Sequence, residues 1–265
     1  MTTLITGATG KTGTRIIERL TAAGVAVRPA SRATGFDWED RSTWAAALAG
    51  ADAAYLAYYP DLAMPGAADI LGAFARQAEA AGVGRLVLLS GRGEPEAQRA
   101  EQEVAGAGVP WTIVRCSWFA QNFSESFMLD GVLSGDVALP AGDTPEPFVD
   151  AEDIADVAFA ALTEHGHAGQ VYELTGPRAL RMDEAVAELA AATGRELRFT
   201  RITPEQYRAA APPELADFVV FLFTELLDGR NAQPQDGVRR ALGRAPRDFG
   251  EFARRTAATG VWATT

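Results

Sequence analysis

The first thirteen residues, MTTLITGATGKTG, constrain the fold of this chain more than any other stretch. A short apolar run around Leu4 enters a turn in which Gly7, Gly10 and Gly13 are spaced three residues apart, and a helical pattern follows. A strand, a glycine turn and a helix in this order place backbone N–H groups where a phosphate binds. The GxxGxxG spacing carries little information alone, but its position after the first strand makes it predict a dinucleotide site.

Each glycine of this turn has an expected physical role. Gly7 allows a tight turn, Gly10 allows the backbone to approach a pyrophosphate, and Gly13 allows the helix to lie close to the sheet. The remaining interpretation, a glycine-rich turn without a ligand, is the weaker one because the turn begins at the first strand.

The composition excludes several classes of protein. A length of 265 residues suits one large α/β domain, or one domain with a small lobe. A net charge of −11 argues against nucleic-acid binding. The single cysteine, Cys116, excludes an internal disulfide, and with only two histidines we expect no metal site. We expect no membrane association, a cytoplasmic location, a small-molecule substrate, and a monomer or homodimer.

Strand and helix patterns alternate through the first half of the chain. The run RLVLLSG at 85–91 is nearly unbroken in apolar residues, which is typical of a parallel strand buried on both faces. Repeated strand–helix alternation indicates a doubly wound parallel sheet. Besides the N-terminal strand, we expect strands at residues 25–30, 35–40, 51–60, 85–91 and 111–116, with helices at 42–50, 66–81 and 95–106.

The second half mixes the two patterns. We expect a loop or short hairpin near the site at 137–148, where proline and glycine are frequent. Helices are expected at 149–164 and 182–193, and strands at 169–176 and 196–203. The predicted fold class is therefore α/β, a doubly wound parallel Rossmann sheet with a small C-terminal substrate lobe. We expect a single NAD(P)-binding domain over 1–265, with its Rossmann core at about 1–116 and 150–176 and the lobe at about 117–149 and 177–265.

The residues after the second strand bear on the choice of cofactor. In dinucleotide folds this position meets the adenosine ribose, and an acid there favours NAD. Here Ser31 and Arg32 follow the strand, and the first acid is Asp37. Arginine makes paired, charge-assisted bonds to phosphate, so the pattern favours NADP(H), whose ribose carries a 2′-phosphate. A solvated surface arginine remains the alternative.

Several segments together resemble one family. GATGKTG, RLVLLSG, VPWTIVRCSWFAQNF and FVDAEDIADVAFAAL are similar to the NmrA-like branch of the atypical short-chain dehydrogenase/reductases, and the resemblance runs nearly from end to end. It is particularly close to bacterial members related to ergot-alkaloid reductases and NADPH-dependent quinone reductases.

The resemblance implies a set of cofactor contacts. The family's dinucleotide loop matches Gly7, Thr9, Gly10, Lys11, Thr12 and Gly13, and its 2′-phosphate site matches Ser31 and Arg32. Its adenine contact matches Asp37 and Trp38, and the floor under the ribose matches Ala57 and Tyr58. The end of the next strand matches Ser90 and Gly91. The stretch from Cys116 to Asn122 matches the segment that faces the nicotinamide and the substrate.

The chain departs from the parent superfamily in its catalytic pair. Typical short-chain reductases use Tyr-x-x-x-Lys, in which the lysine lowers the pKa of the tyrosine that donates the proton. The only lysine here is Lys11, four residues after Gly7, so this pair is absent. The helical segment PEAQRAEQEVAG, where the pair would lie, contains no tyrosine. By resemblance, some members without the pair still transfer hydride, whereas others bind NADP only as sensors.

Other side chains near the expected nicotinamide are candidates for the chemistry. We predict Tyr59 and Ser90 as catalytic residues; the alternatives are that Tyr59 packs at a strand end and that Ser90 bonds only to backbone. The helix residues Glu101 and Glu103 and the histidines of HGH at 165–167 are expected to be solvated. The predicted substrate contacts are Tyr59, Arg92, Trp118, Phe119, Gln121 and Asn122.

Two functions follow from these features. The first is an NADPH-dependent oxidoreductase that transfers hydride, without the Tyr-x-x-x-Lys pair, to a small flat electrophile such as a quinone, enone, imine or carbonyl. The second is a non-catalytic, redox-sensing regulator that binds NADP(H) and acts through a protein partner. The aromatic segment WFAQNF favours the first, and the missing pair keeps the second open.

Overall fold

The computed structural model describes residues 1–263, apart from the side chains of residues 214 and 215. The chain divides into two compact units. Unit 1 comprises Met1–Cys116, Ala151–Leu174 and Asp236–Arg244, and unit 2 comprises Ser117–Asp150, Thr175–Gln235 and Ala245–Thr265. Within the described residues, no helix combines the length and the apolar character needed to cross a bilayer.

Unit 1 is built on a parallel sheet. Its order is β2-β1-β3-β4-β5-β7, and every neighbouring pair of strands is parallel. The order reverses between β1 and β3, and ligands of open α/β sheets bind at such a switch point, outside the carboxyl ends of the strands. The predicted doubly wound α/β fold is confirmed. The strands are β1 (Thr2–Thr6), β2 (Ala26–Ala30), β3 (Ala53–Leu56), β4 (Leu86–Gly91), β5 (Trp111–Cys116) and β7 (Gln170–Leu174).

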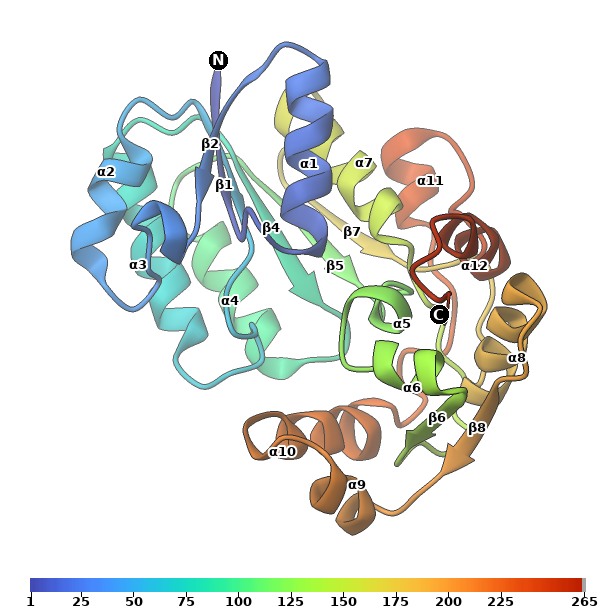
Figure 1. The fold of residues 1–265 in the computed structure, drawn as a ribbon. Coiled ribbons are helices and arrows are strands. Elements are labelled where there is room, and N and C mark those ends of the chain that lie inside the picture. The colour runs from blue at the N-terminus through green and yellow to red at the C-terminus, as the bar shows by residue number, and fades with distance from the viewer. Residues whose placement is uncertain (264–265) are drawn as a thin grey trace. The chain divides into compact units, whose positions relative to one another are not determined.

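Helices cover both faces of this sheet (Figure 1). Helices α1 (Lys11–Ala22) and α7 (Ala151–Thr163) pack against each other on one face. Helices α3 (Ala67–Ala80) and α4 (Pro95–Ala105) pack together on the other, beside the short α2 (Trp44–Leu48). Two single turns of 3-10 helix, η1 (Arg32–Thr34) and η2 (Arg41–Thr43), follow β2.

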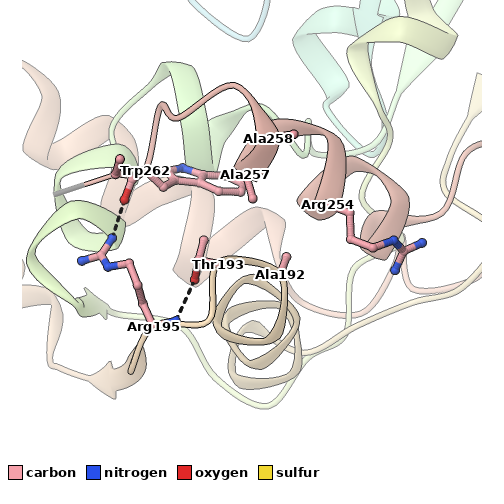
Figure 2. Close-up of a pocket in the computed structure, with 8 residues that line it drawn as sticks. Ala192, Thr193, Arg195, Arg254, Ala257, Ala258 and Trp262 are labelled. Carbon is pink, nitrogen blue, oxygen red and sulfur yellow. Dashed lines mark hydrogen bonds between the residues drawn. The ribbon is translucent and has the colours of Figure 1, made fainter.

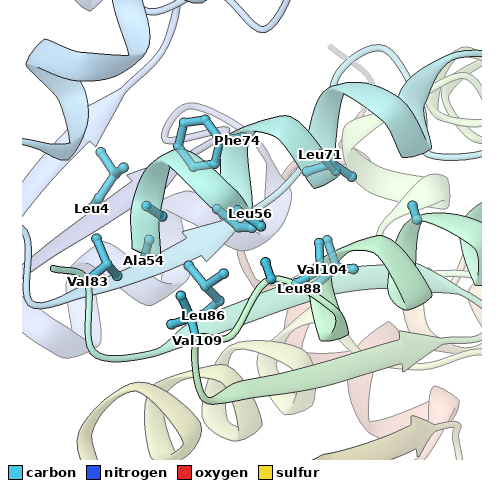
Figure 3. Close-up of a cluster of buried hydrophobic side chains, with 14 of the residues drawn as sticks. Leu4, Ala54, Leu56, Leu71, Phe74, Val83, Leu86, Leu88, Val104 and Val109 are labelled. Atoms are coloured by element: carbon cyan, nitrogen blue, oxygen red, sulfur yellow. The ribbon is translucent and has the colours of Figure 1, made fainter. Parts of the chain in front are cut away.

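Strand periodicity explains the larger core of unit 1 (Figure 3). Alternate residues point to one face of a sheet, so Leu4, Leu56 and Leu88 lie on the same side. They meet apolar residues of the two helices on that face, including Phe74 of α3 and Val104 of α4, all of them buried. This core fixes the carboxyl ends of β1, β3 and β4 at the same edge of the sheet.

The segment 35–40, which we predicted as a third strand, is not a strand. Gly35 has a φ of +82° and ends η1, while the carboxylate of Asp40 accepts a hydrogen bond from the Ser42 amide and caps η2. Between them, Trp38 is buried against Phe74, with ring centroids 4.9 Å apart. The alternation of polar and apolar residues thus reflects two consecutive turns anchored by an aromatic side chain.

Unit 2 contains a second, smaller sheet. Strands β6 (Asp136–Leu139) and β8 (Arg198–Arg201) pair in parallel. The prediction of a loop or hairpin at 137–148 is therefore wrong at its start, because parallel strands require a long crossover rather than a hairpin turn. The remaining elements are α5 (Asn122–Glu125), α6 (Leu129–Ser134), α8 (Met182–Thr193), α9 (Pro204–Ala210), α10 (Pro213–Phe221), a π-helical turn (Leu222–Leu226) and α12 (Phe249–Ala258).

One segment belongs to a different unit from the one predicted. Residues 236–244, which we assigned to the lobe, lie in unit 1 and contain α11 (Gly237–Leu242). A side chain at Gly237 would collide with the backbone of Glu173, since its Cβ would lie 2.2 Å from that carbonyl oxygen. Arg244, just after α11, forms an ion pair at 2.7 Å with Asp153 of α7. These contacts attach the helix to β7 and α7. The description of the whole chain as a single domain stays a prediction.

Candidate functional site

The glycine loop has the close contacts expected of a phosphate-binding turn. Gly7 has a φ of +62°, a conformation that side chains rarely adopt. A Cβ at Gly13 would lie 2.2 Å from the Gly7 carbonyl oxygen, so the start of α1 can approach the loop only without a side chain there. A Cβ at Gly10 would lie 3.2 Å from the same oxygen. The loop is therefore shaped by all three glycines.

The start of α1 can accept an anion. Gly10 is the N-cap residue, is exposed, and supplies no side chain to cap the helix; the first turn contains no acid. The first N–H groups of a helix lack partners within it, and the helix dipole makes this end positive. Thr9 is also exposed, whereas Lys11 is partly buried. A cradle in which glycine is sterically required, at an uncapped helix start, fits the pyrophosphate of a dinucleotide.

Thr12 acts from inside the loop. Its side chain is buried, and its hydroxyl oxygen accepts a hydrogen bond of 2.9 Å from the Tyr55 hydroxyl of β3. Burial raises the pKa of Tyr55 well above its ordinary value. The Thr12 side chain therefore anchors the loop to the sheet rather than reaching outward to a ligand.

Ala57 lies directly under the loop. Its Cβ is 3.0 Å from the position that a Gly7 Cβ would take. Its amide donates to the Thr6 hydroxyl at 2.8 Å, and its carbonyl accepts from the Trp38 indole at 3.2 Å. The Trp38 ring is buried and contacts Ala57 through this bond; its predicted place beside the adenine stays a prediction. Tyr58 packs on that ring, with centroids 5.5 Å apart, and burial raises its pKa.

The end of β2 brings together two residues that we had placed apart. Ser31 begins η1, and the exposed Arg32 follows it. The guanidinium carbon of Arg32 lies 4.8 Å from the centroid of the Tyr59 ring, which is 60% exposed. The sequence places Arg32 at the adenosine end of the cofactor and Tyr59 at the reacting end, and both roles stay predictions. Strand β3 ends at Leu56, so Tyr59 lies in the segment after the strand, beside Arg32 of η1.

Asp37 is engaged in its own turn. Its carboxylate accepts a hydrogen bond of 2.9 Å from the Glu39 amide, and its carbonyl accepts one of 2.9 Å from the Trp44 indole. The adenine contact predicted for Asp37 stays a prediction.

A charged network lies at the ends of β4 and β5. The Ser90 hydroxyl donates to the Glu101 carboxylate at 2.6 Å, and Arg115 forms ion pairs with both Glu101 and Glu173. Hydrogen bonding to Glu101 raises the pKa of Arg115. Arg92, which is buried, reaches Glu173 at 3.2 Å.

This network bears on three expectations. The Ser90 hydroxyl donates to Glu101, and its predicted catalytic role stays a prediction. Arg92 is buried against Glu173, and its predicted substrate contact stays a prediction. Glu101 is 5% exposed rather than solvated, since α4 turns it inward toward Arg115. His167 is likewise buried, with its Nδ1 2.9 Å from the Tyr172 hydroxyl.

Sequence reasoning missed Glu94, the N-cap residue of α4. Its carboxyl group occupies the space above Gly91, where an added Cβ would lie 2.4 Å from the Glu94 Cδ and from both carboxyl oxygens. Burial raises the pKa of Glu94 to about 8, with further contributions from Asp61 and Glu101. The signal in the sequence is SGRGEPE, in which an acid directly follows a strand-end glycine turn.

The predicted substrate residues of unit 2 are mostly packed within it. Trp118 is buried, with its ring centroid 4.8 Å from that of Phe223. Gln121 is buried and donates to the Asp150 carboxylate at 2.8 Å. Phe119 and Asn122 are partly exposed. Their contacts with a substrate stay predictions.

A cavity of about 430 Å³ in unit 2 contains none of the predicted site residues. It lies between the ends of α8 and α12 (Figure 2). Arg195 is not available to a ligand there, because its guanidinium donates to the carbonyls of Val132, Leu133 and Trp262. The cavity lining is otherwise mostly alanine, and it offers no group for the expected chemistry.

The glycine cradle on a parallel sheet and the arginine after β2 define the class of protein, a dinucleotide-binding protein with a Rossmann fold. A profile of the NAD(P)H-binding family matches residues 7–165. The chain belongs to this family, and its resemblance to the NmrA-like reductases is confirmed. NAD(P)H is accordingly its cofactor.

Enzymes are among its relatives. The chain is 32% identical to an NAD(P)H azoreductase of Xenophilus azovorans, over 96% of this chain and 98% of the relative. It is 35% identical to the (4-alkanoyl-5-oxo-2,5-dihydrofuran-3-yl)methyl phosphate reductase of Streptomyces griseus, over 94% and 96%. The NADPH-dependent quinone oxidoreductase of Escherichia coli, solved with NADPH, shares the fold with a TM-score of 0.77 at 22% identity, over 96% and 99%. The chain is an NAD(P)H-dependent reductase.

Proposed function

We propose that this reductase prefers NADPH and transfers hydride to a small, flat electrophile, namely a quinone, enone, imine or carbonyl, without a Tyr-x-x-x-Lys pair. The observation that carries the proposal is the glycine cradle at the start of α1, with an exposed arginine at the end of the neighbouring β2. Relatives that are reductases over their whole length support the reaction class.

Three groups of this chain have roles in holding the cofactor. The N–H groups at the start of α1 bind the pyrophosphate, since the N-cap residue Gly10 has no side chain to cap them. The guanidinium of Arg32 binds the 2′-phosphate, and the Tyr59 ring keeps that guanidinium in place. When bound, NADPH supplies the hydride, and the protein supplies orientation and electrostatics.

The acceptor is expected to be flat because the relatives include an azoreductase and a reductase of an unsaturated furanone phosphate. The proposed substrate contacts remain Trp118, Phe119, Gln121 and Asn122. We also propose the cytoplasmic location and the monomeric or homodimeric state predicted above. A second function, that of a regulator, is favoured by one observation: Ser90, Arg92 and Tyr59 are all engaged with other side chains of unit 1.

One experiment separates the two functions. The purified chain is titrated with NADPH, NADP+ and NADH, and NADPH oxidation is then followed by absorbance over a panel of quinones, enones, iminium ions, aldehydes and azo dyes. A reductase binds NADPH more tightly than NADH and consumes it with at least one acceptor class. Tight binding of NADPH and NADP+ alike, with no oxidation across the panel, refutes the reductase and leaves the regulator.

A further inference from the structure

Glu94 lies at the edge of the sheet where the chemistry of this fold occurs. It stands three residues beyond the end of β4, after a turn in which Gly93 has a φ of +73°. Its carboxyl group fills the space above Gly91, a position that we predicted to contact the cofactor. Ligands of open α/β sheets bind outside the carboxyl ends of the strands, and this carboxyl group is already there.

The surroundings of Glu94 raise the pKa of its carboxyl group. The neighbours that act on it are acids: Asp61, from the loop after β3, and Glu101, from α4. Cys116, at the end of β5, is buried, and burial together with Glu94 raises the pKa of its thiol. The arginines of this edge, Arg92 and Arg115, form ion pairs with Glu101 and Glu173. Among the residues that the structure describes, none forms a hydrogen bond or an ion pair with the Glu94 carboxyl group.

Two hydroxyl groups of this edge are committed elsewhere, because that of Ser90 donates to Glu101 and that of Tyr55 donates to Thr12. Glu94 follows the end of β4, and its carboxyl group has no hydrogen-bond partner among the described residues. A carboxyl group with a pKa near 8 carries its proton at neutral pH and can release it in a reaction.

We infer that Glu94 is the catalytic proton donor of the reduction, in the role that tyrosine has in typical short-chain reductases; this inference rests on the proposed function. The substrate gains two electrons as a hydride from NADPH at its electrophilic carbon, and a proton from the Glu94 carboxyl group at its oxygen or nitrogen. The cofactor is left oxidised as NADP+. The Glu94 carboxylate regains its proton from water, which restores the enzyme.

A comparison of two acceptors tests this role. A ketone or enone needs a proton on its oxygen, whereas a permanently cationic iminium ion becomes a neutral amine by gaining hydride alone. In Glu94→Gln, which keeps the shape of the side chain, we expect turnover of the ketone or enone to fall about 10²–10⁴-fold and turnover of the iminium ion to stay within about twofold. Glu94→Asp keeps the acid and should recover part of the lost rate.

The control is Glu96→Gln, two residues further along α4. Glu96 forms a surface ion pair with Arg99 and belongs to no proposed site, so its loss should leave both acceptors unchanged. If Glu94→Gln slows both acceptors equally, or slows neither, Glu94 is not the proton donor. If none of the acceptors tested lets the unmodified chain oxidise NADPH, the proposed function itself fails, and the inference fails with it.

A binding measurement tests the position of Glu94 without turnover. Ionisation of Glu94 next to the cofactor favours the positively charged ring of NADP+ over the neutral ring of NADPH. Affinity for NADP+ should therefore rise about two- to tenfold between pH 7 and pH 9, with a midpoint near 8, while affinity for NADPH does not share this rise. The same pH dependence of NADP+ binding in Glu94→Gln would overturn the assignment. Its absence in that variant supports it.

Discussion

Removal of the Tyr59 ring should weaken the preference for NADPH and leave the chemical step intact. The ring lies 4.8 Å from the guanidinium carbon of Arg32, and both side chains are exposed. A cation–π contact at an exposed site contributes about 0.5–1 kcal/mol, which corresponds to about two- to fivefold in affinity. Loss of the guanidinium itself removes a charged hydrogen bond of about 1.5–3 kcal/mol, or about 10- to 150-fold.

These magnitudes predict an order of effects. In Tyr59→Ala the ratio of NADPH to NADH affinity should fall about two- to fivefold, and in Arg32→Ala about 10-fold or more. Tyr59→Phe keeps the ring and should resemble the unmodified chain. In the double variant, removal of Tyr59 should add nothing to the loss caused by Arg32→Ala, because the ring acts through the guanidinium.

Fluorescence titration gives the dissociation constants, and steady-state kinetics gives kcat. We expect Tyr59→Ala to change the cofactor preference and to leave kcat unaltered. If Tyr59→Phe and Tyr59→Ala both lower kcat and leave cofactor affinity unchanged, Tyr59 acts at the reacting end, as first predicted from the sequence, and its stacking on Arg32 has no part in binding.

Three further predictions concern the loop, the charged network and pH. Gly13→Ala should weaken NADPH binding at least tenfold and destabilise the fold by about 1–3 kcal/mol, because the new Cβ meets backbone at 2.2 Å. The control Gly142→Ala, at a position with open space, should change neither binding nor stability. Titration measures the binding, and thermal melts measure the stability. Arg115→Met should lower the free energy of unfolding by about 3–5 kcal/mol in urea, because it leaves the buried Glu101 carboxylate unpaired, and a loss below about 1 kcal/mol would contradict this. Glu94 has a folded pKa of about 8 against an ordinary 4.5, so the folded state binds more protons between these values and stability falls as pH rises through this window. The melting temperature of Glu94→Gln should therefore exceed that of the unmodified chain by an amount that grows from pH 5 to pH 8. A difference that stays constant over this range would argue against the raised pKa.

The parallel sheet was predictable because its information is local. Strands such as RLVLLSG are apolar throughout, and helices such as α7 begin with acids that suit the helix dipole. The glycine loop was predictable for the same reason, since Gly7 and Gly13 need their conformation and packing whatever lies elsewhere. Residues 35–40 lacked such a determinant. Trp38 is buried by Phe74 of α3, far along the chain, and this tertiary contact outweighs a weak strand pattern.

The contacts of the site residues that the sequence did not reveal share a different cause. Whether Ser90 is a free hydroxyl depends on Glu101, eleven residues later, and on Arg115, which turns that carboxylate inward. Whether Tyr59 belongs to the substrate depends on the point where β3 stops. A residue's identity does not show which charge it pairs with or where its strand ends, so the sequence places a position at the carboxyl edge without showing its contacts there.

A carboxylic acid and a tyrosine can serve the same reaction if their pKa values are shifted toward neutral pH from opposite directions. In the usual pair a lysine lowers the pKa of tyrosine from about 10, whereas here burial beside two acids raises the pKa of Glu94 from 4.5 to about 8. The second route needs no lysine, and this chain has only one, Lys11, in the glycine loop. It does need a site without a free cation, because a nearby arginine would return the carboxyl to its charged form. The network that binds Arg92 and Arg115 to Glu173 and Glu101 removes those cations from Glu94. Arg115→Met and Glu173→Gln therefore change the acidity of Glu94 in opposite directions: loss of the cation raises its pKa further, and release of Arg92 and Arg115 lowers it. NMR titration of the glutamate carboxyl carbons, with Glu94→Gln to assign the resonance, measures both shifts, and shifts of the same sign would refute this account.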